Sequence, residues 1–470
     1  MFTTLDAEPR KLATEIVRRI QAAGFSAFWV GGCVRDFLLG REPGDYDIAT
    51  SALPDQIEEL FPHTVPVGRK FGVIVVVESE HQFQVATFRT EADYCDGRRP
   101  ETVVFADARA DAERRDFTVN GLFFDPVTGE THDWVGGEAD LRANVIRTIG
   151  SPEERFAEDH LRLLRAVRFA AQLGFEIEPA TFAALQANAA KIRLISAERV
   201  RDELLKLFAP PADWSAGLRP GANQAPQRAG SEIGAPAARG LELLRTSGLL
   251  EHILPEIAAT VTCDQSPDFH PEGTVFQHLC LMLKQLPPDS HPSLPWAVLL
   301  HDVAKPVTAS RDPQTGSIHF YEHEKIGAKM AEEILGRLRF PRKQIEEIAT
   351  AVRFHMQFKD APQMRKATLR RMLLRETFPL ELALHRLDCL GSHGTLDVYD
   401  FLVTQAAELA NQPEIRPPLL TGEDLIALGM PPGKAMGALL HELREKQLQD
   451  ELKTPAEAKR WVWERFVESP

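Results

Sequence analysis

The stretch WVGGCVRDFLLGREPGDYDIAT, residues 29–50, decides the fold of the first part of the chain. Two glycines, Gly31 and Gly32, follow a short apolar run, and two aspartates, Asp45 and Asp47, follow further along. A strand places side chains two positions apart on the same face, so we expect both carboxylates to point the same way. Paired carboxylates suit a hard divalent cation, and Mg²⁺ fits best when phosphates and waters complete its shell.

The glycine pair predicts a close approach of the backbone to a phosphate. Glycine has no Cβ, and the start of the helix that follows Gly31 and Gly32 offers free N–H groups to an anion. Arg35, one turn into that helix, adds a positive charge that suits a triphosphate. Taken alone, an Asp-x-Asp pair is more often a solvated turn, and a glycine pair is more often a tight turn. Their order and spacing together favour phosphoryl or nucleotidyl transfer.

Composition excludes several classes of protein. The chain has 470 residues, 44% hydrophobic and 26% charged, which indicates a globular protein of roughly two to four domains. The formal net charge of −14 argues against a general nucleic-acid coat but leaves room for a local basic track. No apolar run reaches the ~18 residues of a membrane span, and we expect no export signal. Five scattered cysteines indicate a reducing compartment, so we expect a cytoplasmic protein.

Apolar periodicity divides the chain into a mixed first part and a helical remainder. The runs FGVIVVVES and HQFQVATFR predict a β-hairpin, and the polar segment EADYCDGRRP predicts a loop. From Arg155 onward the spacing is helical, and Ser196 is the predicted N-cap of one helix. Residues 209–239 are rich in Pro, Gly and Ala, which indicates a linker or an insertion.

The head resembles class II tRNA nucleotidyltransferases and bacterial poly(A) polymerases, a branch of the polymerase-β-like superfamily. The resemblance begins with VGGCVRDFLLG and GDYDIATSA and continues through RRDFTVNGLFFDP, DWVGG, VIRTIG and RFAEDHLRLLRAVRFAAQLGF, over roughly residues 15–208. It implies that Asp45 and Asp47 are catalytic and hold Mg²⁺, so that a tRNA 3′-hydroxyl attacks the α-phosphate of a nucleotide and pyrophosphate leaves.

The resemblance also implies a set of nucleotide-binding residues. The RRD of the second motif is similar to the family's ribose and triphosphate contacts. One departure concerns the metal site, because superfamily members often carry a third acid on a neighbouring strand and FQVATFR has Gln84 there. The implied nucleotide-binding set is Gly31, Gly32, Arg35, Arg114, Arg115, Asp116, Asp159, Arg162 and Arg165.

The segment EDHLR predicts a pair of side chains that reads the edge of a base. Asp159 and Arg162 are three positions apart, so in a helix they share a face. The alternative is a surface ion pair of little energetic value. A carboxylate accepts the amino hydrogens of C or A and a guanidinium donates to their acceptors, whereas U and G leave both groups unpaired. The resemblance assigns the same role, base selection without a template, to this EDxxR motif.

The EDHLR segment does not separate addition of C, C and A from poly(A), A-only or CC-only addition. Phe71-Gly72 in VGRKFGVIVV favours a tRNA enzyme, and EADYCDGRRP resembles a full-length loop that helps the switch from C to A. The implied partners are CTP, ATP, and the 3′ end and acceptor arm of tRNA, with no membrane. The oligomeric state stays open.

The helical half carries a second pattern, of histidines and aspartates. His278, the pair His301-Asp302 and Asp388 follow the order H…HD…D of HD phosphohydrolases, which this part of the chain resembles. The resemblance implies that these four residues hold a metal, either a divalent transition metal or Mg²⁺. A lone histidine is more often structural, but here several follow in the expected order.

The same resemblance implies that His323 and His355 hold a second metal. Lys305, one turn after the HD pair, is a candidate to face a phosphate. Metals in such sites activate water, and related tRNA enzymes act there on cyclic phosphates, 2′-nucleotides or pyrophosphate-like substrates. One alternative is a fold that only shapes the tRNA-binding body. Another is that the HD site carries the main activity and the head binds RNA.

We therefore predict an α/β nucleotidyltransferase head with a small mixed or antiparallel sheet, followed by an all-α body that includes an HD-type domain. The tail LLTGEDLIALGMPPGKAMGALLHEL resembles the C-terminal segment of long bacterial tRNA nucleotidyltransferases. The predicted parts are the catalytic head at 1–150, a neck for base selection and RNA binding at 151–208, the linker or insertion at 209–239, the HD-type domain at 240–410 and the helical tail at 411–470.

Overall fold

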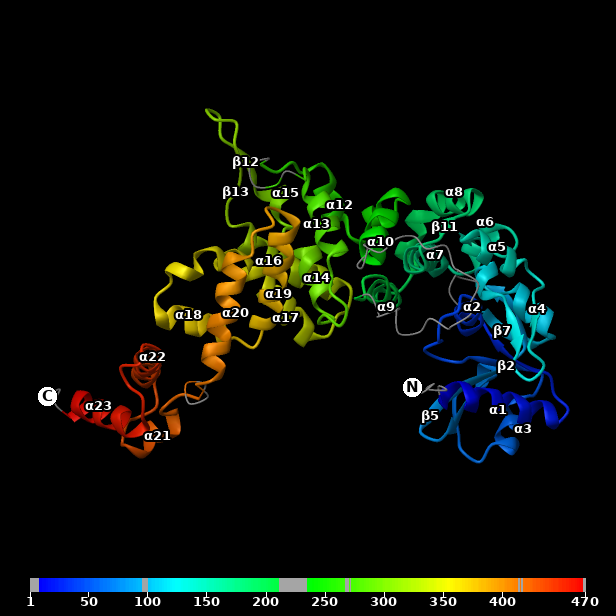
Figure 1. Ribbon diagram of the computed structural model, residues 1–470, viewed down its shortest axis with the longest axis horizontal. Helices are drawn as coiled ribbons and strands as arrows, with labels where there is room; N and C mark the ends of the chain where they lie inside the picture. The colour runs from blue at the N-terminus through cyan, green and yellow to red at the C-terminus, as the bar shows by residue number, and fades with distance from the viewer. Residues whose placement is uncertain are drawn as a thin grey trace, which may run out of the picture. The chain divides into compact units, whose positions relative to one another are not determined.

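The computed structural model forms two compact units (Figure 1). The first unit contains the chain up to Ala259 and two short segments, 283–290 and 337–340, and the second contains the rest. Within the part of the chain that the structure describes, none of the helices combines the length and the apolar character that a membrane span requires. The described residues are 8–94, 100–210, 235–266, 270, 272–412, 415 and 417–467.

A mixed seven-stranded sheet forms the centre of the first unit. Its strand order is β3-β4-β5-β2-β1-β8-β9, and neighbours are antiparallel except β2 and β5, which are parallel. The predicted hairpin is confirmed, because β4 and β5 pair from Val73 opposite Ala86 to Glu78 opposite His81. The strands are β1 (Ala27–Val30), β2 (Ile48–Thr50), β3 (Thr64–Gly68), β4 (Val73–Glu78), β5 (His81–Thr87), β8 (Phe123–Asp125) and β9 (Glu130–His132).

A separate two-stranded sheet replaces part of the predicted loop EADYCDGRRP. β6 (Arg89–Tyr94) pairs antiparallel with β7 (Pro100–Phe105). The prediction of a loop is wrong at both ends of this segment, because a strand depends on its partner strand as well as on its own composition. The central residues 95–99 lie outside the described residues, as does most of the predicted linker, residues 211–234.

The central strand β1 is buried on both faces, which fixes the glycine turn that follows it. Trp29 is 1% exposed, and its ring packs against Tyr46 with centroids 4.8 Å apart. Val30, on the opposite face, belongs to a cluster that includes Phe123. Helix α1 (Glu8–Ala22) contacts β1 and β2 and buries one stripe of apolar residues. Further head elements are α2 (Gly32–Leu38), α3 (Pro54–Leu60), α4 (Ala108–Glu113), the 3₁₀ turns η1 (Arg69–Phe71) and η2 (Thr118–Asn120), and α5 (Gly137–Ala143).

The neck begins with two helices where the sequence predicts a continuous one. α6 (Pro152–Glu158) ends before Asp159, whose backbone is extended with φ −144° and ψ 106°, and α7 (Leu161–Leu173) follows. The Asp159 carboxylate accepts a hydrogen bond from the Leu161 N–H at 3.0 Å. Aspartate competes for backbone N–H groups in this way and so interrupts the helix.

The remaining elements of the first unit are helical apart from two short strands. α9 (Ala197–Leu207) begins after Ser196, the predicted N-cap, although the Ser196 side chain makes no capping hydrogen bond. α7 contacts both α9 and α10. The other elements are the parallel pair β10 (Val145–Ile146) and β11 (Glu176–Ile177), α8 (Pro179–Asn188), η3 (Ala189–Leu194), α10 (Ala235–Thr246), α11 (Leu250–Ile253) and α12 (Pro255–Ala258).

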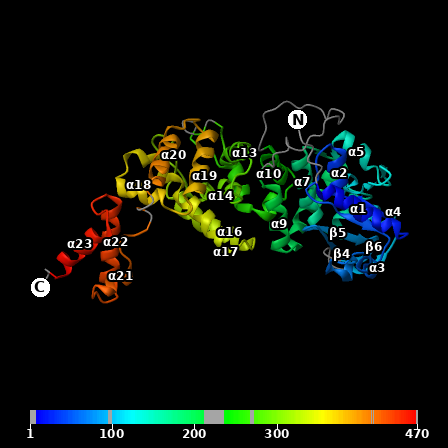
Figure 2. The same cartoon turned by 60° about the horizontal axis from the view of Figure 1, so that its bottom comes forward.

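The second unit is helical except for one hairpin, as the fold prediction expects. Helices α14, α17 and α19 contact one another, and every residue of α14 is buried. The last three helices, α21 to α23, lie together (Figure 2). They share an apolar core of their own around Leu425 and Leu443. The helices and strands are α13 (Val275–Lys284), α14 (Leu294–Leu300), α15 (Lys305–Thr308), β12 (Ala309–Arg311), β13 (Ile318–Phe320), α16 (His323–Arg337), α17 (Arg342–Phe354), α18 (Lys366–Leu373), α19 (Phe378–Gly391), α20 (Asp397–Ala410), α21 (Gly422–Ala427), α22 (Lys434–Leu448) and α23 (Pro455–Val467).

Candidate functional site

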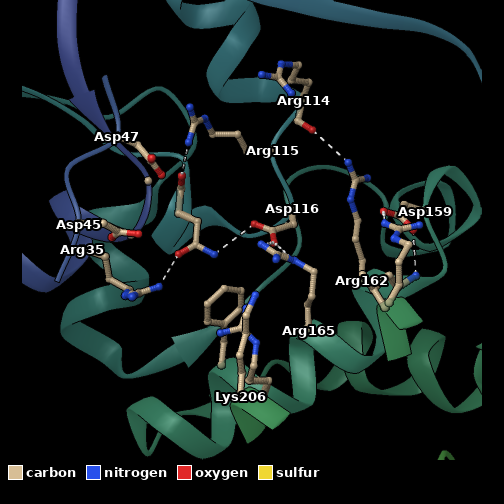
Figure 3. Close-up of a pocket in the computed structure, with 17 residues that line it drawn as sticks. Arg35, Asp45, Asp47, Arg114, Arg115, Asp116, Asp159, Arg162, Arg165 and Lys206 are labelled. Atoms are coloured by element: carbon tan, nitrogen blue, oxygen red, sulfur yellow. Dashed lines mark hydrogen bonds and ion pairs between the residues drawn. The ribbon is translucent and has the colours of Figure 1, made fainter. Parts of the chain in front are cut away.

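A cavity of about 680 Å³ in the first unit gathers side chains from five separate segments (Figure 3). The segments are the glycine turn after β1, the residues before β2, the stretch from Arg114 to Asn120, and the helices α7 and α9. All the head residues that the sequence assigns to metal or nucleotide binding line this cavity. They are Gly31, Gly32, Arg35, Asp45, Asp47, Arg114, Arg115, Asp116, Asp159, Arg162 and Arg165.

Asp45 and Asp47 lie immediately before β2 and not within it, because β2 begins at Ile48. The backbone is nevertheless paired at Asp47, whose carbonyl accepts a hydrogen bond from the Val30 N–H at 3.0 Å. Tyr46 is buried against the core, whereas Asp45 and Asp47 line the cavity. The predicted alternation, with Asp45 and Asp47 on one face and Tyr46 on the other, therefore holds in the residues just before β2.

The two carboxylates are placed as a cation site requires. Burial and the charge of Asp45, opposed by Arg115, together raise the pKa of Asp47 to about 6. Among the described residues, neither aspartate has a cationic side-chain atom within 4.0 Å, whereas Asp116 and Asp159 are each paired with an arginine. A divalent cation would relieve the repulsion between Asp45 and Asp47, so this pair fits a bound metal.

The cavity shows no third carboxylate available for a metal among the described residues. Gln84 is exposed on β5 and is not one of the residues that line the cavity. Asp116 is buried, and its Oδ2 lies 2.6 Å from Arg165 Nη2. Burial alone would raise the pKa of Asp116, but Arg165 and Asn120 lower it to about 2. Asp116 therefore serves as the counter-charge of an arginine.

A chain of hydrogen bonds holds the cationic side chains in place (Figure 3). Arg35 Nη1 donates to Asn120 Oδ1 at 2.8 Å, and Asn120 Nδ2 donates to Asp116 Oδ1 at 3.1 Å. Arg165 donates to the other oxygen of Asp116. These hydrogen bonds link α2, the turn η2 and α7, and they fix the direction of the Arg35 and Arg165 guanidinium groups.

Asp159 and Arg162 do not share a helix face, which corrects the expectation for EDHLR. Asp159 Oδ2 lies 2.7 Å from Arg199 Nη2, on α9. Arg162 forms an ion pair with Glu158, and its Nη2 donates to the Arg114 carbonyl at 3.3 Å. The break between α6 and α7 separates the two residues, so each is held at the cavity wall by partners of its own.

Several residues of the cavity were missed by the sequence reasoning. Arg168 is visible in the sequence as part of a basic run, but a run of arginines on a helix is usually solvated. Here Arg168 continues the cavity-facing side of α7, and its guanidinium carbon lies 4.0 Å from the centre of the Phe169 ring. The lining contains eight arginine and lysine residues against four aspartates, which suits a polyanionic ligand. The missed residues are Asn120, Leu161, Arg168, Phe169, Arg199 and Lys206.

The second unit brings the six predicted HD residues together in two adjoining groups. Within each group the ligand atoms lie within 4.8 Å of one another. The groups meet where His301 Nε2 lies 3.2 Å from Asp302 Oδ2. The first group is His278, His301 and Asp388, and the second is Asp302, His323 and His355.

Backbone carbonyls orient three of these histidines. The Nδ1 atoms of His301, His323 and His355 each lie 2.7 to 2.8 Å from the carbonyl oxygen three residues earlier. A carbonyl only accepts, so each Nδ1 carries the proton and each Nε2 presents a lone pair. The Nε2 atoms of His323 and His355 face each other at 3.2 Å, an arrangement that calls for a cation between them.

The pKa shifts of Asp302 and His355 also fit a metal. Burial would raise the pKa of Asp302, but His301 and Lys305 hold it well below its usual range. Burial and the neighbouring His301 lower the pKa of His355 to about 3. An ionised carboxylate and a neutral imidazole are the forms that bind metals.

Two further residues beside the cluster were missed by the sequence reasoning. Glu272 Oε1 lies 2.8 Å from His278 Nδ1 and 2.9 Å from His270 Nδ1. The signal was present in the run HPEGTVFQH, which places both residues shortly before His278.

Lys305, which the sequence suggested would face a phosphate, is buried and lies 2.6 Å from Asp302 Oδ2.

Family models match three parts of the chain. A model described as the poly A polymerase head domain matches residues 27–147, and one described as the probable RNA and SrmB-binding site of polymerase A matches residues 174–218. A model of the HD domain matches residues 275–388.

Curated relatives and solved structures agree with these models. The CCA-adding enzyme of Staphylococcus aureus (strain MRSA252) is 46% identical over 197 residues, which are 42% of this chain and 49% of the relative. The chain thus matches about half the length of its curated relatives. The crystal structure of Bacillus stearothermophilus CCA-adding enzyme in complex with CTP is 27% identical, with a TM-score of 0.70 and 98% of each chain covered.

The fold is shared more widely. Thermotoga maritima CCA-adding enzyme, solved in complex with tRNA, is 18% identical with a TM-score of 0.55, over 99% of this chain and 97% of that one. At that identity the likeness concerns the fold alone. The head motifs, the three family models and the full-length match to the CTP complex point to one conclusion. The chain carries a poly A polymerase head domain and an HD domain, and over its whole length it is similar to a CCA-adding enzyme.

Proposed function

We propose that this chain adds C, C and A to the 3′ end of tRNA in the cytoplasm, using CTP and ATP and releasing pyrophosphate. One observation carries the proposal. A single cavity contains the carboxylate pair Asp45 and Asp47 and also the base-selecting candidates Asp159 and Arg162. The Staphylococcus aureus relative and the protein of the CTP complex are both CCA-adding enzymes, which supports this choice of reaction.

The chain's own residues prepare the transfer. Mg²⁺ held by Asp45 and Asp47 would activate the 3′-hydroxyl and balance charge on the triphosphate. The arginines of the cavity bind and orient the triphosphate. Gly31 lets the backbone come close to Arg115. Its φ is 74°, and a Cβ there would lie 2.9 Å from Arg115 Nη1. A side chain at this position would displace an arginine that faces the phosphates.

Base selection follows from the chemistry of two separately held groups. Asp159 has a lone pair left for the amino group of C or A, because a carboxylate accepts about four hydrogen bonds and the described contacts use two. Arg162 donates to the acceptor beside that amino group. U and G would present a donor to Arg162 and an acceptor to Asp159, which leaves buried groups unpaired.

Poly(A), A-only and CC-only addition remain the alternatives within the family, since they would use the same cavity. The names of the relatives favour CCA addition. A different class of function, an HD phosphohydrolase with an RNA-binding head, is disfavoured by the carboxylate pair and the cationic residues that line the head cavity.

We propose in addition that the second unit is a metal-dependent phosphohydrolase. The facing Nε2 atoms of His323 and His355 are the observation that favours it. A divalent metal there, either a transition metal or Mg²⁺, would activate water. Asp302, His323 and His355 would supply one group of ligand atoms, and His278, His301 and Asp388 would supply the other.

Nucleotide incorporation tests the first proposal. Pure protein incubated with tRNA lacking its terminal CCA should add C, C and A and then stop. Asp45→Ala and Asp47→Ala should each abolish addition and retain tRNA binding, because they remove the metal ligands and leave the cationic surface. Gel analysis with each nucleotide alone and in combination measures this. A long A tail, or use of one nucleotide type only, contradicts the proposal.

Base selection is tested by Arg162→Ala against Arg109→Ala, an exposed arginine on α4 that pairs with Glu113. Arg162→Ala should lower kcat/KM for CTP and ATP about tenfold or more and narrow the margin over UTP and GTP, because a charge-assisted hydrogen bond is lost. Arg109→Ala should behave as wild type. Equal discrimination in both variants would show that Arg162 does not read the base.

Burial of Asp47 and its repulsion by Asp45 predict a pH-dependent stability. Its folded pKa of about 6 exceeds the ordinary 3.8, so ionised Asp47 destabilises the metal-free fold above pH 6, and this cost disappears as the pH falls towards 4. At pH 8 in EDTA, Asp47→Asn should raise the thermal midpoint of the first unit by about 2–4 °C, the shift for about 1 kcal/mol.

The matched control is Glu59→Gln, which removes an exposed charge on α3. It should leave the midpoint unchanged. Saturating Mg²⁺ should stabilise the wild type and not Asp47→Asn. A midpoint for Asp47→Asn that is equal to or below the wild type at pH 8 refutes the predicted repulsion.

Hydrolysis of a phosphodiester such as bis(p-nitrophenyl) phosphate tests the second proposal. Wild type with Mn²⁺ should turn over, and His301→Ala should lose the activity while still adding nucleotides to tRNA, because the two sites use different residues. Asp45→Ala should show the reverse pattern. Equal hydrolysis by wild type and His301→Ala ends the proposal.

A further inference from the structure

His278 differs from the other three histidines of the cluster in what its Nδ1 atom faces. In those three residues the Nδ1 atom lies beside a backbone carbonyl oxygen. His278 Nδ1 instead lies 2.8 Å from Oε1 of Glu272, a side chain outside the two groups that the HD pattern predicts. The Nε2 atom of the same ring lies 3.1 Å from Asp388 Oδ1. A carboxylate therefore stands beside each nitrogen of this imidazole.

The local chain brings Glu272 back onto the helix that carries His278. Gly273 follows it with a φ of 111°, a conformation that glycine adopts without strain, and α13 begins two residues later. On the other side, Gly391 of α19 leaves room for the imidazole, because a Cβ there would lie 3.3 Å from His278 Cε1. The His278 side chain has no exposed surface, so packing restricts how its ring can turn.

His270 fixes Glu272 from a second direction. Its Nδ1 lies 2.9 Å from the same Oε1, and its ring packs edge-on against His278 with centroids 5.0 Å apart. A carboxylate only accepts hydrogen bonds, so the protons belong to the Nδ1 atoms of both histidines. A neutral imidazole with its proton on Nδ1 has its lone pair on Nε2, and it can bind a cation only through that atom.

The alternative is that His270, Glu272 and His278 hold a cation of their own, since their ligand atoms also lie within 4.8 Å of one another. A neutral imidazole has one lone pair, so His278 can serve only one of the two groups to which it belongs. The ligands of a tetrahedral ion, with bonds of about 2.0–2.1 Å, lie about 3.3 Å apart. The 3.1 Å between His278 and Asp388 is nearer to that spacing, whereas 2.8 and 2.9 Å are typical lengths of hydrogen bonds.

We propose that Glu272 is a positioning residue of the HD metal centre: its Oε1 accepts the Nδ1 proton of His278 and so directs the Nε2 lone pair towards the ligand group of Asp388. The inference rests on the proposed metal-dependent phosphohydrolase, because it explains how one ligand of that site is held. His270 keeps Glu272 in place. The charge of Glu272 also makes the imidazole of His278 a stronger ligand.

Calorimetric titration of the full chain with Mn²⁺ tests the inference without any turnover. Glu272→Ala should weaken the binding of Mn²⁺ about 10- to 100-fold, the usual effect of removing the partner of a metal-binding histidine. Glu272→Gln keeps an accepting oxygen and loses the charge, so it should bind several times more tightly than Glu272→Ala. Equal losses in both variants would show that Glu272 acts through its charge alone, which overturns the positioning role.

Two further variants separate this role from its alternatives. Glu332→Ala is the matched control, because it removes an exposed carboxylate from α16, the helix that also carries His323. It should bind Mn²⁺ as the wild type does, since exposed charges are screened. His270→Ala should keep the number of bound ions and weaken their binding less than Glu272→Ala. Loss of one bound ion in His270→Ala would assign a cation to the Glu272 group and overturn the inference.

Nitrogen-15 NMR of the histidine-labelled protein with Zn²⁺ reads the tautomer directly. The signal of His278, identified by its loss in His278→Ala, should show a protonated Nδ1 in the wild type and in Glu272→Gln. A protonated Nε2 in the zinc-bound wild type refutes the inference. Glu272→Ala should show faster exchange of the Nδ1 proton with water, because the acceptor that protects it is gone.

The same measurements separate this inference from the proposal on which it rests. If the wild type binds Mn²⁺ and hydrolyses no phosphodiester, the phosphohydrolase fails, and the affinities of the Glu272 variants still decide the positioning role. If the wild type hydrolyses the ester and Glu272→Ala binds Mn²⁺ equally well, only the positioning role is refuted. If the wild type binds no Mn²⁺, the metal centre and the positioning role fail together.

Discussion

The hydrogen-bonded chain from Arg35 through Asn120 and Asp116 to Arg165 is the constraint on which the head site depends. A cavity lined by many guanidinium groups is unstable by itself, because like charges repel in a medium of low dielectric. Asp116 is buried and ionised between them, so it offsets part of this repulsion and fixes where the remaining positive charge points. The negative charge of a triphosphate then completes an arrangement that the protein leaves partly unbalanced.

The two candidate sites leave their ligand atoms unpaired in different ways. In the head, Asp45 and Asp47 lie close together with no cationic side chain of the described residues within 4.0 Å, and burial and their mutual repulsion raise the pKa of Asp47. In the second unit, backbone carbonyls accept hydrogen bonds from Nδ1 of His323 and His355. The Nε2 atoms of the two rings then face each other. Both arrangements become favourable only when a cation is present. The local strain of each site is thus a consequence of preorganisation for a metal.

Much of this organisation could be predicted from the sequence, and the failures have physical causes. The glycine turn, the aspartate pair and the grouping of the HD histidines and aspartates could be predicted because short segments carry them at fixed spacing. The break at Asp159 was missed because apolar periodicity does not register a side chain that captures a backbone N–H. The contact between Asp159 and Arg199 was missed because the two residues are 40 positions apart in sequence. Tertiary packing decides such contacts.

If Asp159 and Arg162 select the base as proposed, the selection depends on the packing of the neck and not on one helix. Asp159 is held by Arg199 from α9, and Arg162 is held by Glu158 and by the Arg114 carbonyl of the head. The distance between the accepting and the donating group is therefore set by three segments that pack together. A small movement of α9 against α7 would change that distance and leave the carboxylate pair untouched. Nucleotide choice can then vary within one family while the chemistry of transfer stays the same.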